Sequence, residues 1–221
     1  MKKYDMAGLA SGLAGIFIVV YAVNLFNGYV LGGLPVLLRM PLMVVSYWSI
    51  ALFPCLISRY LKDRASDLGF KGNEVWRQLF TGILTGAGMS VIFTLVPHLA
   101  GFGEYVDNER RYIYLWQFIF EFVYCIGAVS LVEEFCFRGF VFARIKNLTG
   151  RESLAIAGSS VFFGLFHLFS GDPLQLVITS AIGVFFCLCR SKLKYCSTLS
   201  LIIAHGIYDA MISVWSSVFF S

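Results

Sequence analysis

Residues 112–142 read YIYLWQFIFEFVYCIGAVSLVEEFCFRGFVF, an apolar run that contains Glu133, Glu134 and Arg138. Ionisable groups are costly to keep in hydrocarbon, and those found within membrane segments usually serve a function. Two later apolar runs each contain a histidine, His167 and His205. Three segments that each contribute polar side chains predict a buried reaction centre.

The composition of the 221 residues is that of a membrane protein. Hydrophobic residues make up 58% of the chain and charged residues 14%, and the mean hydropathy is +0.78, beyond ordinary globular usage. The longest polar stretch, residues 59–78, is too short to form a core of its own. We therefore expect a single integral membrane domain over residues 1–221. Its expected partners include the lipid bilayer but no nucleic acid.

Apolar segments of the length that a membrane helix needs, roughly 20 residues, recur along the chain. They cover residues 7–31, 35–58, 78–102, 112–143, 153–169, 173–189 and 196–220. The expected fold is an all-α polytopic bundle of seven transmembrane helices. The fourth segment is too long for one straight crossing, and aromatic residues near its start favour the headgroup region, which predicts an eighth, partial helix.

Lys and Arg residues accumulate in alternate loops. Lys2 and Lys3 precede the first segment, and further positive charges fall in the stretches 59–77, 144–151 and 190–194, whereas the intervening loops carry few. The positive-inside rule then predicts a cytoplasmic N-terminus and a C-terminus outside. The net charge of +4 follows from these loops. The compact length and short loops favour a bacterial inner-membrane protein.

Pairs of residues spaced four apart recur in the three segments that carry polar side chains, and residues at this spacing share one face of a helix. The pairs are Glu134 with Arg138, Phe163 with His167, and His205 with Asp209. Glu134 and Arg138 are expected to form an ion pair within one helix. Glu133 then lies about 100° around that helix, so we predict that it is the reactive carboxylate. Glu121, one turn from the start of the same segment, is interpreted as a solvated interfacial carboxylate.

The three motifs together resemble the CPBP family, which includes the type II CAAX prenyl endopeptidases and their bacterial relatives. The chain has Glu133-Glu134-x-x-x-Arg138 followed by Gly139, then Phe163-x-x-x-His167, then His205-x-x-x-Asp209. The sequence DLGF at residues 67–70 also resembles the loop before the core in bacterial members. The motifs lie between residues 133 and 209, within an expected three-motif core of residues 112–215.

The resemblance implies peptide-bond hydrolysis within the membrane. Glu133 and His167 match the residues that hold and activate a water molecule, and His205 and Asp209 match positions thought to stabilise the oxyanion. Glu134, Arg138 and Phe163 have supporting roles. Many members have Asn at the position of Asp209, and an ionised Asp would repel an oxyanion. Asp209 is therefore either protonated or orients His205.

The same residues also suggest a metal site. Glu133, His167 and His205, with Asp209 as a fourth or outer ligand, resemble a zinc site of histidines and carboxylates. The family has been described both as metalloproteases and as glutamate-type proteases. We favour metal-free general-base catalysis without a cofactor, because the sequence lacks an H-E-x-x-H pair on one helix; zinc is the alternative.

Two alternatives to a protease come from other functional classes. In a proton-coupled transporter, the buried Glu and His residues would form a proton relay, although we see no internal inverted repeat. A bacteriocin-immunity or other partner-binding protein would need no catalysis. For the protease, the expected partner is a membrane-associated peptide or protein. In a bacterium, this substrate is not expected to be a prenylated CAAX protein.

Overall fold

The computed structural model describes residues 2–168 and 173–219. This part of the chain is 84% helical and contains no strand. Six of its helical runs are long and apolar enough to cross a membrane: Lys3–Gly33, Val36–Tyr60, Val75–Tyr105, Leu115–Thr149, Pro173–Lys192 and Thr198–Val218. The predicted all-α polytopic membrane fold is confirmed. The remaining expected segment, residues 153–169, corresponds to α8 (Glu152–His167), a helix of 16 residues.

The chain divides into two compact units, which we describe separately. Unit 1 comprises Met1–Lys71 and Val132–Lys194, and unit 2 comprises Gly72–Leu131 and Tyr195–Ser221. The expectation of a single membrane domain over the whole chain stays a prediction.

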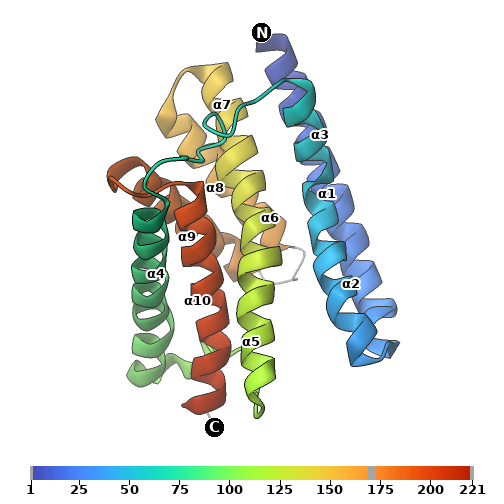
Figure 1. Cartoon of the computed structure of the whole chain (residues 1–221), viewed down its shortest axis with the longest axis vertical. Helices are drawn as coiled ribbons and strands as arrows, with labels where there is room; N and C mark the ends of the chain where they lie inside the picture. The colour runs from blue at the N-terminus through green and yellow to red at the C-terminus, as the bar shows by residue number, and fades with distance from the viewer. Residues whose placement is uncertain (1, 169–172, 220–221) are drawn as a thin grey trace. The chain divides into compact units, whose positions relative to one another are not determined.

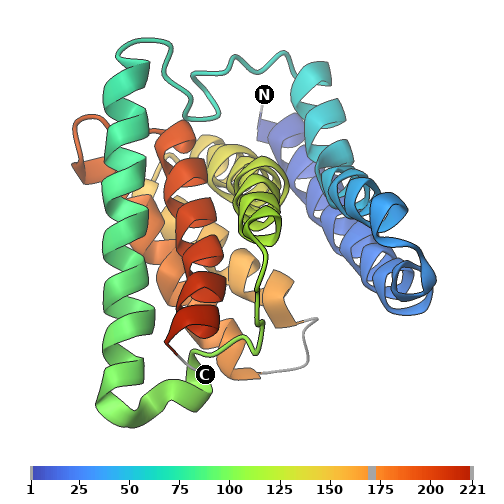
Figure 2. The same ribbon diagram turned by 60° about the horizontal axis from the view of Figure 1, so that its bottom comes forward.

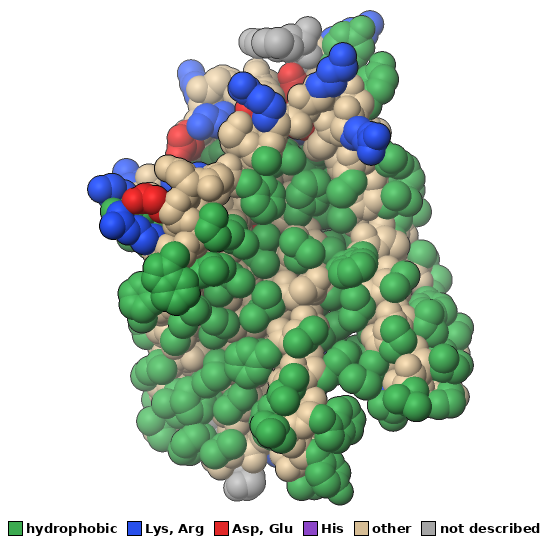
Figure 3. All heavy atoms as spheres, in the orientation of Figure 1, with side chains coloured by type: hydrophobic (Ala, Val, Ile, Leu, Met, Phe, Trp, Pro, Cys, Tyr) green, Lys and Arg blue, Asp and Glu red, His purple; other side chains and the backbone are tan. Residues whose placement is uncertain are grey.

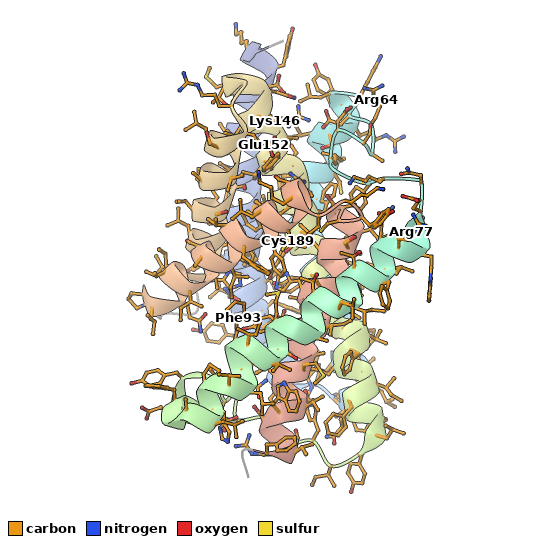
Figure 4. The ribbon with its side chains drawn as sticks, turned by 90° about the vertical axis from the view of Figure 1, so that its left-hand side faces the viewer. Arg64, Arg77, Phe93, Lys146, Glu152 and Cys189 are labelled. Carbon is orange, nitrogen blue, oxygen red and sulfur yellow. The ribbon has the colours of Figure 1, made fainter. Side chains whose placement is uncertain are left out.

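Unit 1 begins with α1 (Lys2–Tyr29), which lies beside α2 (Val36–Trp48) and α3 (Leu52–Tyr60) (Figure 1). The other helices of the unit are α7 (Phe142–Thr149), α8 and α9 (Pro173–Lys192). Gly150, at φ +69°, ends α7 in the left-handed conformation that glycine adopts without strain. At the turn that follows, Lys146 Nζ lies 3.3 Å from Glu152 Oε2 (Figure 4).

The core of unit 1 is built from large apolar side chains. One buried cluster contains Ile16 of α1, Phe137 and Phe140 of the segment Glu134–Val141, and Phe163 of α8. At one end of the unit, the buried guanidinium of Arg144 contacts two carboxylates, with Arg144 Nη1 2.7 Å from Asp5 Oδ1 and Nη2 against Asp63. This cluster of charges joins α1, the stretch that follows α3, and α7, since Asp5, Asp63 and Arg144 lie in these three places.

Unit 2 contains α4 (Val75–Ser90), α5 (Leu115–Tyr124) and α10 (Thr198–Val218). α4 and α10 pack side by side (Figure 2). Their backbones approach closely at Gly82, where an added Cβ atom would lie only 2.6 Å from the carbonyl oxygen of Ser200. The side chain of Ser197 caps α10 by accepting from the backbone N–H of Ser200.

Outward-facing side chains on many of these helices are apolar. Figure 3 shows hydrophobic side chains along the visible sides of the helices, with Lys and Arg side chains near helix ends. Large hydrophobic side chains that are exposed include Ile18 of α1 and Leu37 of α2. In water such a surface would be costly, whereas it suits a hydrocarbon environment.

The run Leu115–Thr149 alternates between α-helical and π-helical turns. After α5 come a π-helical segment, Cys125–Ser130, the short α6 (Leu131–Glu133), a second π-helical segment, Glu134–Val141, and then α7. π-Helical turns hold one residue more per hydrogen-bonded turn than an α-helix, and they are frequent at functional sites. Glu133 therefore lies at the end of the short α-helical stretch between two such segments.

Candidate active site

Glu133 is buried within unit 1, with 2% of its surface exposed. Its carboxylate faces His167, the last residue of α8, with Glu133 Oε2 3.8 Å from His167 Nε2. The structure thus brings together the two residues that were predicted to activate a water molecule. The separation is too long for a direct hydrogen bond.

The tautomer of His167 follows from its second ring nitrogen. Nδ1 lies 2.9 Å from the carbonyl oxygen of Phe163. Because a carbonyl can only accept, Nδ1 must carry the hydrogen, and in the neutral ring Nε2 is then an acceptor. Two acceptors, Glu133 Oε2 and His167 Nε2, therefore face each other, and one water molecule placed between them can donate to both.

A third residue, Tyr47 of α2, completes the surroundings of Glu133. The hydroxyl of Tyr47 donates a hydrogen bond to Glu133 Oε1. Sequence analysis did not select this tyrosine, because it lies 86 residues before Glu133 in a segment without any motif. Nothing in the sequence distinguishes it from the other tyrosines of apolar segments.

Glu134 and Arg138 form the predicted ion pair. Arg138 Nη1 lies 3.0 Å from Glu134 Oε1, and both side chains are fully buried. The guanidinium of Arg138 also lies over the ring of Phe163, 3.9 Å from its centre, in a cation–π contact that is worth about 2 kcal/mol when desolvated. This contact gives Phe163 a physical role, because it joins the buried arginine to α8 one turn before His167.

Aromatic rings add to the attachment of α8. The ring of Phe137 packs edge-on against those of Phe163 and Phe166, with centroids 5.4 and 5.3 Å apart. The ring of Phe163 in turn packs against the imidazole of His167, at 4.6 Å. The position of His167 is therefore set by close packing as well as by its hydrogen bond.

His205 and Asp209 form a second polar pair, on α10 in unit 2. His205 Nε2 lies 3.3 Å from Asp209 Oδ2. The side chain of His205 is buried, whereas that of Asp209 is 28% exposed. The structure brings together the two members of each pair, Glu133 with His167 and His205 with Asp209. The meeting of all four residues in one centre stays a prediction.

Within residues 2–168 and 173–219, no group of three or more His, Cys, Asp or Glu side chains lies together in a way that could hold a metal ion. The zinc site of Glu133, His167, His205 and Asp209 draws its residues from both units and stays a prediction, and we derive no step through a metal.

The interpretation of Glu121 as a solvated interfacial carboxylate is wrong. The side chain is buried in unit 2, where it is paired with Arg110 and accepts hydrogen bonds from the Tyr112 hydroxyl and from Ser213 Oγ, each at 2.9 Å. Burial, together with the Glu121 carboxylate, raises the pKa of Tyr112 to about 12, so this phenol stays a donor. The stretch before α5 thus shields Glu121 from solvent.

The fold and the site define an integral membrane protein with a buried carboxylate that faces an imidazole. Residues 112–211 match the family model described as Type II CAAX prenyl endopeptidase Rce1-like. Residues 112–211 therefore resemble this protease family, and the predicted resemblance to the CPBP family is confirmed. The matched family is a protease family, which supports a peptidase activity and implies a peptide or protein substrate.

The matched segment contains all of the motif residues, from Glu133 to Asp209, whereas Tyr47 lies outside it. Neither the comparison with curated proteins nor the comparison with solved structures gave a match.

Proposed function

We propose that this protein is a membrane-embedded endopeptidase that hydrolyses a peptide bond of a membrane-associated peptide or protein, with Glu133 as its general base. The observation that carries the proposal is the pairing of Glu133 with His167, at 3.8 Å, inside a segment that matches a protease family. A buried carboxylate beside a neutral imidazole suits the activation of water.

The water molecule would donate one hydrogen to Glu133 Oε2 and the other to His167 Nε2. A water oxygen about 2.8 Å from each atom is compatible with their separation of 3.8 Å. Its lone pairs then point away from both acceptors, toward the position of a scissile carbonyl carbon. This arrangement uses the two acceptors to aim the nucleophile.

The reaction then needs one proton to move twice. As the water oxygen bonds to the carbonyl carbon, Glu133 takes a proton from the water and a tetrahedral oxyanion forms. As the C–N bond breaks, the protonated Glu133 gives that proton to the leaving amine. The products are a carboxylic acid and an amine, and Glu133 returns to its carboxylate form.

His205 would stabilise the oxyanion, a role that rests on its match to the family motif. An imidazolium has two N–H donors, of which one suits Asp209, 3.3 Å away, and the other the oxyanion. Asp209 would then act through His205 by orienting the ring. This role avoids the repulsion that an ionised Asp209 would exert on the oxyanion directly.

We propose that the reaction is metal-free, because the water activation above uses only a carboxylate and an imidazole. Zinc bound by residues of the same motifs is the alternative, and a chelator separates the two. If the chelator abolishes cleavage and zinc restores it, the metal-dependent form is correct. Cleavage that survives the chelator supports the carboxylate-activated water.

The test is cleavage of membrane-proximal peptides by the purified protein in liposomes. We expect the wild type to cleave at least one member of a peptide library, Glu133→Gln and His167→Ala to be inactive, and Glu104→Gln to be active. Glu104 is a matched control because it is an exposed glutamate. Equal cleavage by the wild type and by Glu133→Gln would overturn the proposal.

Two other outcomes would favour the alternative functions. Proton flux that depends on Glu133, without cleavage, would favour a transporter. An immunity phenotype that survives Glu133→Gln would favour a binding protein.

A further inference from the structure

We propose that Tyr47 is a positioning residue that holds the carboxylate of Glu133 in its reactive orientation. This inference rests on the proposed function, since it assigns the active centre a residue from outside the motifs. It rests on contacts within unit 1, where α2, Glu133 and α8 all lie. Tyr47 lies well before the segment 112–211 that matches the protease family.

The two carboxylate oxygens of Glu133 have different neighbours. Oε1 accepts the hydrogen bond of the Tyr47 hydroxyl, and Oε2 is the oxygen 3.8 Å from His167 Nε2. One side of the carboxylate is therefore bound to a fixed donor, and the other faces the position proposed for the water molecule. The phenol thus determines which oxygen faces the imidazole.

A fixed donor matters here because a glutamate carboxylate has little orientation of its own. The terminal torsion of a Glu side chain has a broad, roughly two-fold distribution, so the carboxylate plane turns easily. General-base catalysis requires the accepting oxygen to lie within hydrogen-bond reach of the proton that it takes. Reactive groups need to be held within about 0.5 Å of their productive positions. A hydrogen bond from Tyr47 supplies this restraint.

The ring of Tyr47 is itself held in place by packing. It is partly buried against the apolar core of unit 1. Ile50, three residues further on, is fully buried in the same core within the 3₁₀ turn Ser49–Ala51 that follows α2. The ring is therefore anchored independently of its hydroxyl. Phenylalanine at this position would keep the packing and remove only the donor.

The test compares Tyr47→Phe with Tyr29→Phe and Glu133→Gln, all in liposomes. Tyr29→Phe is the matched control, because it removes the same hydroxyl from a highly exposed tyrosine of α1 in the same unit. We expect Tyr47→Phe to lower kcat about tenfold or more, the scale of one lost hydrogen bond to a charged group. KM and the unfolding temperature are expected to stay at their wild-type values.

A second readout does not depend on cleavage. Infrared difference spectra between the wild type and Glu133→Gln identify the carboxylate band of Glu133. We expect Tyr47→Phe to shift this band, because the loss of the phenol changes the hydrogen bonding of Oε1, and Tyr29→Phe to leave it in place. A merely structural role for Tyr47 would alter the unfolding temperature without shifting the band.

The outcomes separate the two proposals. If Glu133→Gln is inactive but Tyr47→Phe has the wild-type kcat and an unshifted band, the role of Tyr47 is wrong and the proposed function stands. If Glu133→Gln cleaves like the wild type, the proposed function is wrong, whatever the band shows. A fall in kcat without a band shift would also overturn positioning through Glu133.

Discussion

Three carboxylates lie on the single helical run Leu115–Thr149, and their surroundings differ in kind. Glu121 is paired with Arg110, and Glu134 with Arg138. Glu133, next in the chain to Glu134, instead meets the phenol of Tyr47 and the imidazole of His167. An arginine carries a permanent charge that compensates a buried carboxylate, whereas an imidazole exchanges protons near neutral pH.

This difference distinguishes carboxylates that stabilise the fold from a carboxylate that could take part in a reaction. A buried carboxylate held by an arginine is stabilised as an ion and has no reason to take up a proton. A carboxylate between a phenol and an imidazole has no permanently charged partner in these contacts, so it is better suited to accept a proton. These surroundings support a structural role for Glu121 and Glu134 and the proposed catalytic role for Glu133.

The largest effect is expected for Glu133→Gln. This change keeps the shape of the side chain and removes the base, so kcat/KM for peptide cleavage is expected to fall by about 10³-fold. The unfolding temperature should stay close to that of the wild type. Kinetics and thermal unfolding on the same samples check both statements. Loss of folding together with activity would place Glu133 in the structural class of Glu134.

Arg138→Met is expected to cost the most stability. It leaves Glu134 buried without its cation, and breaking a buried pair in this way costs about 3 to 5 kcal/mol. The double variant Glu134→Gln/Arg138→Met removes both charges, so it is expected to recover much of the loss. Unfolding free energies in detergent measure the difference. A single variant as stable as the wild type would contradict the structural role.

Glu121→Gln is expected to have a smaller effect. The side chain of Arg110 is 50% exposed, so it can be hydrated once its partner is neutral, and the loss is limited to about 1 to 2 kcal/mol. Peptide cleavage should continue at the wild-type rate. A large loss of cleavage with intact folding would show that Glu121 belongs with Glu133.

The smallest effect concerns an ion pair outside the membrane segments. Arg111 donates to Asp107, with Arg111 Nη2 2.6 Å from Asp107 Oδ2, and this bond is the main reason that the pKa of Asp107 is lowered to about 2. The unfolded-state pKa is about 4. The contribution is therefore present above pH 4 and lost as the pH falls toward 2.

Hydrogen exchange of residues 106–114 between pH 5 and pH 2 measures this loss, once it is corrected for the intrinsic pH dependence of exchange. The protection of the wild type should fall through this window. Protection in Asp107→Asn should stay flat, because the amide does not titrate there. A fall of equal size in both proteins would show that the pair does not hold this stretch.

Sequence periodicity predicted the parts of the fold and site that are local. Glu134 with Arg138 and His205 with Asp209 lie four residues apart, and both pairs are found, since a helix brings such residues together whatever else surrounds it. The helical runs follow from apolar length in the same way.

Contacts between distant segments were not predictable. Tyr47 reaches Glu133 across 86 residues, and Ser213 reaches Glu121 across 92. Periodicity carries no information on such pairs, because they depend on which helices become neighbours. The shielding of Glu121 also depends on an irregular stretch before α5, whose path no helical pattern describes. The sequence therefore predicted the carboxylates but not their surroundings.

The length of the π-helical segment Glu134–Val141 is constrained by the residues on either side of it. Glu133 lies before it, and Arg144, which contacts Asp5 and Asp63, lies after it. Deleting one residue from the segment would turn these two side chains relative to each other by about 100°, so they could no longer both reach their partners. In natural variation, this stretch should accept changes of residue type far more readily than changes of length.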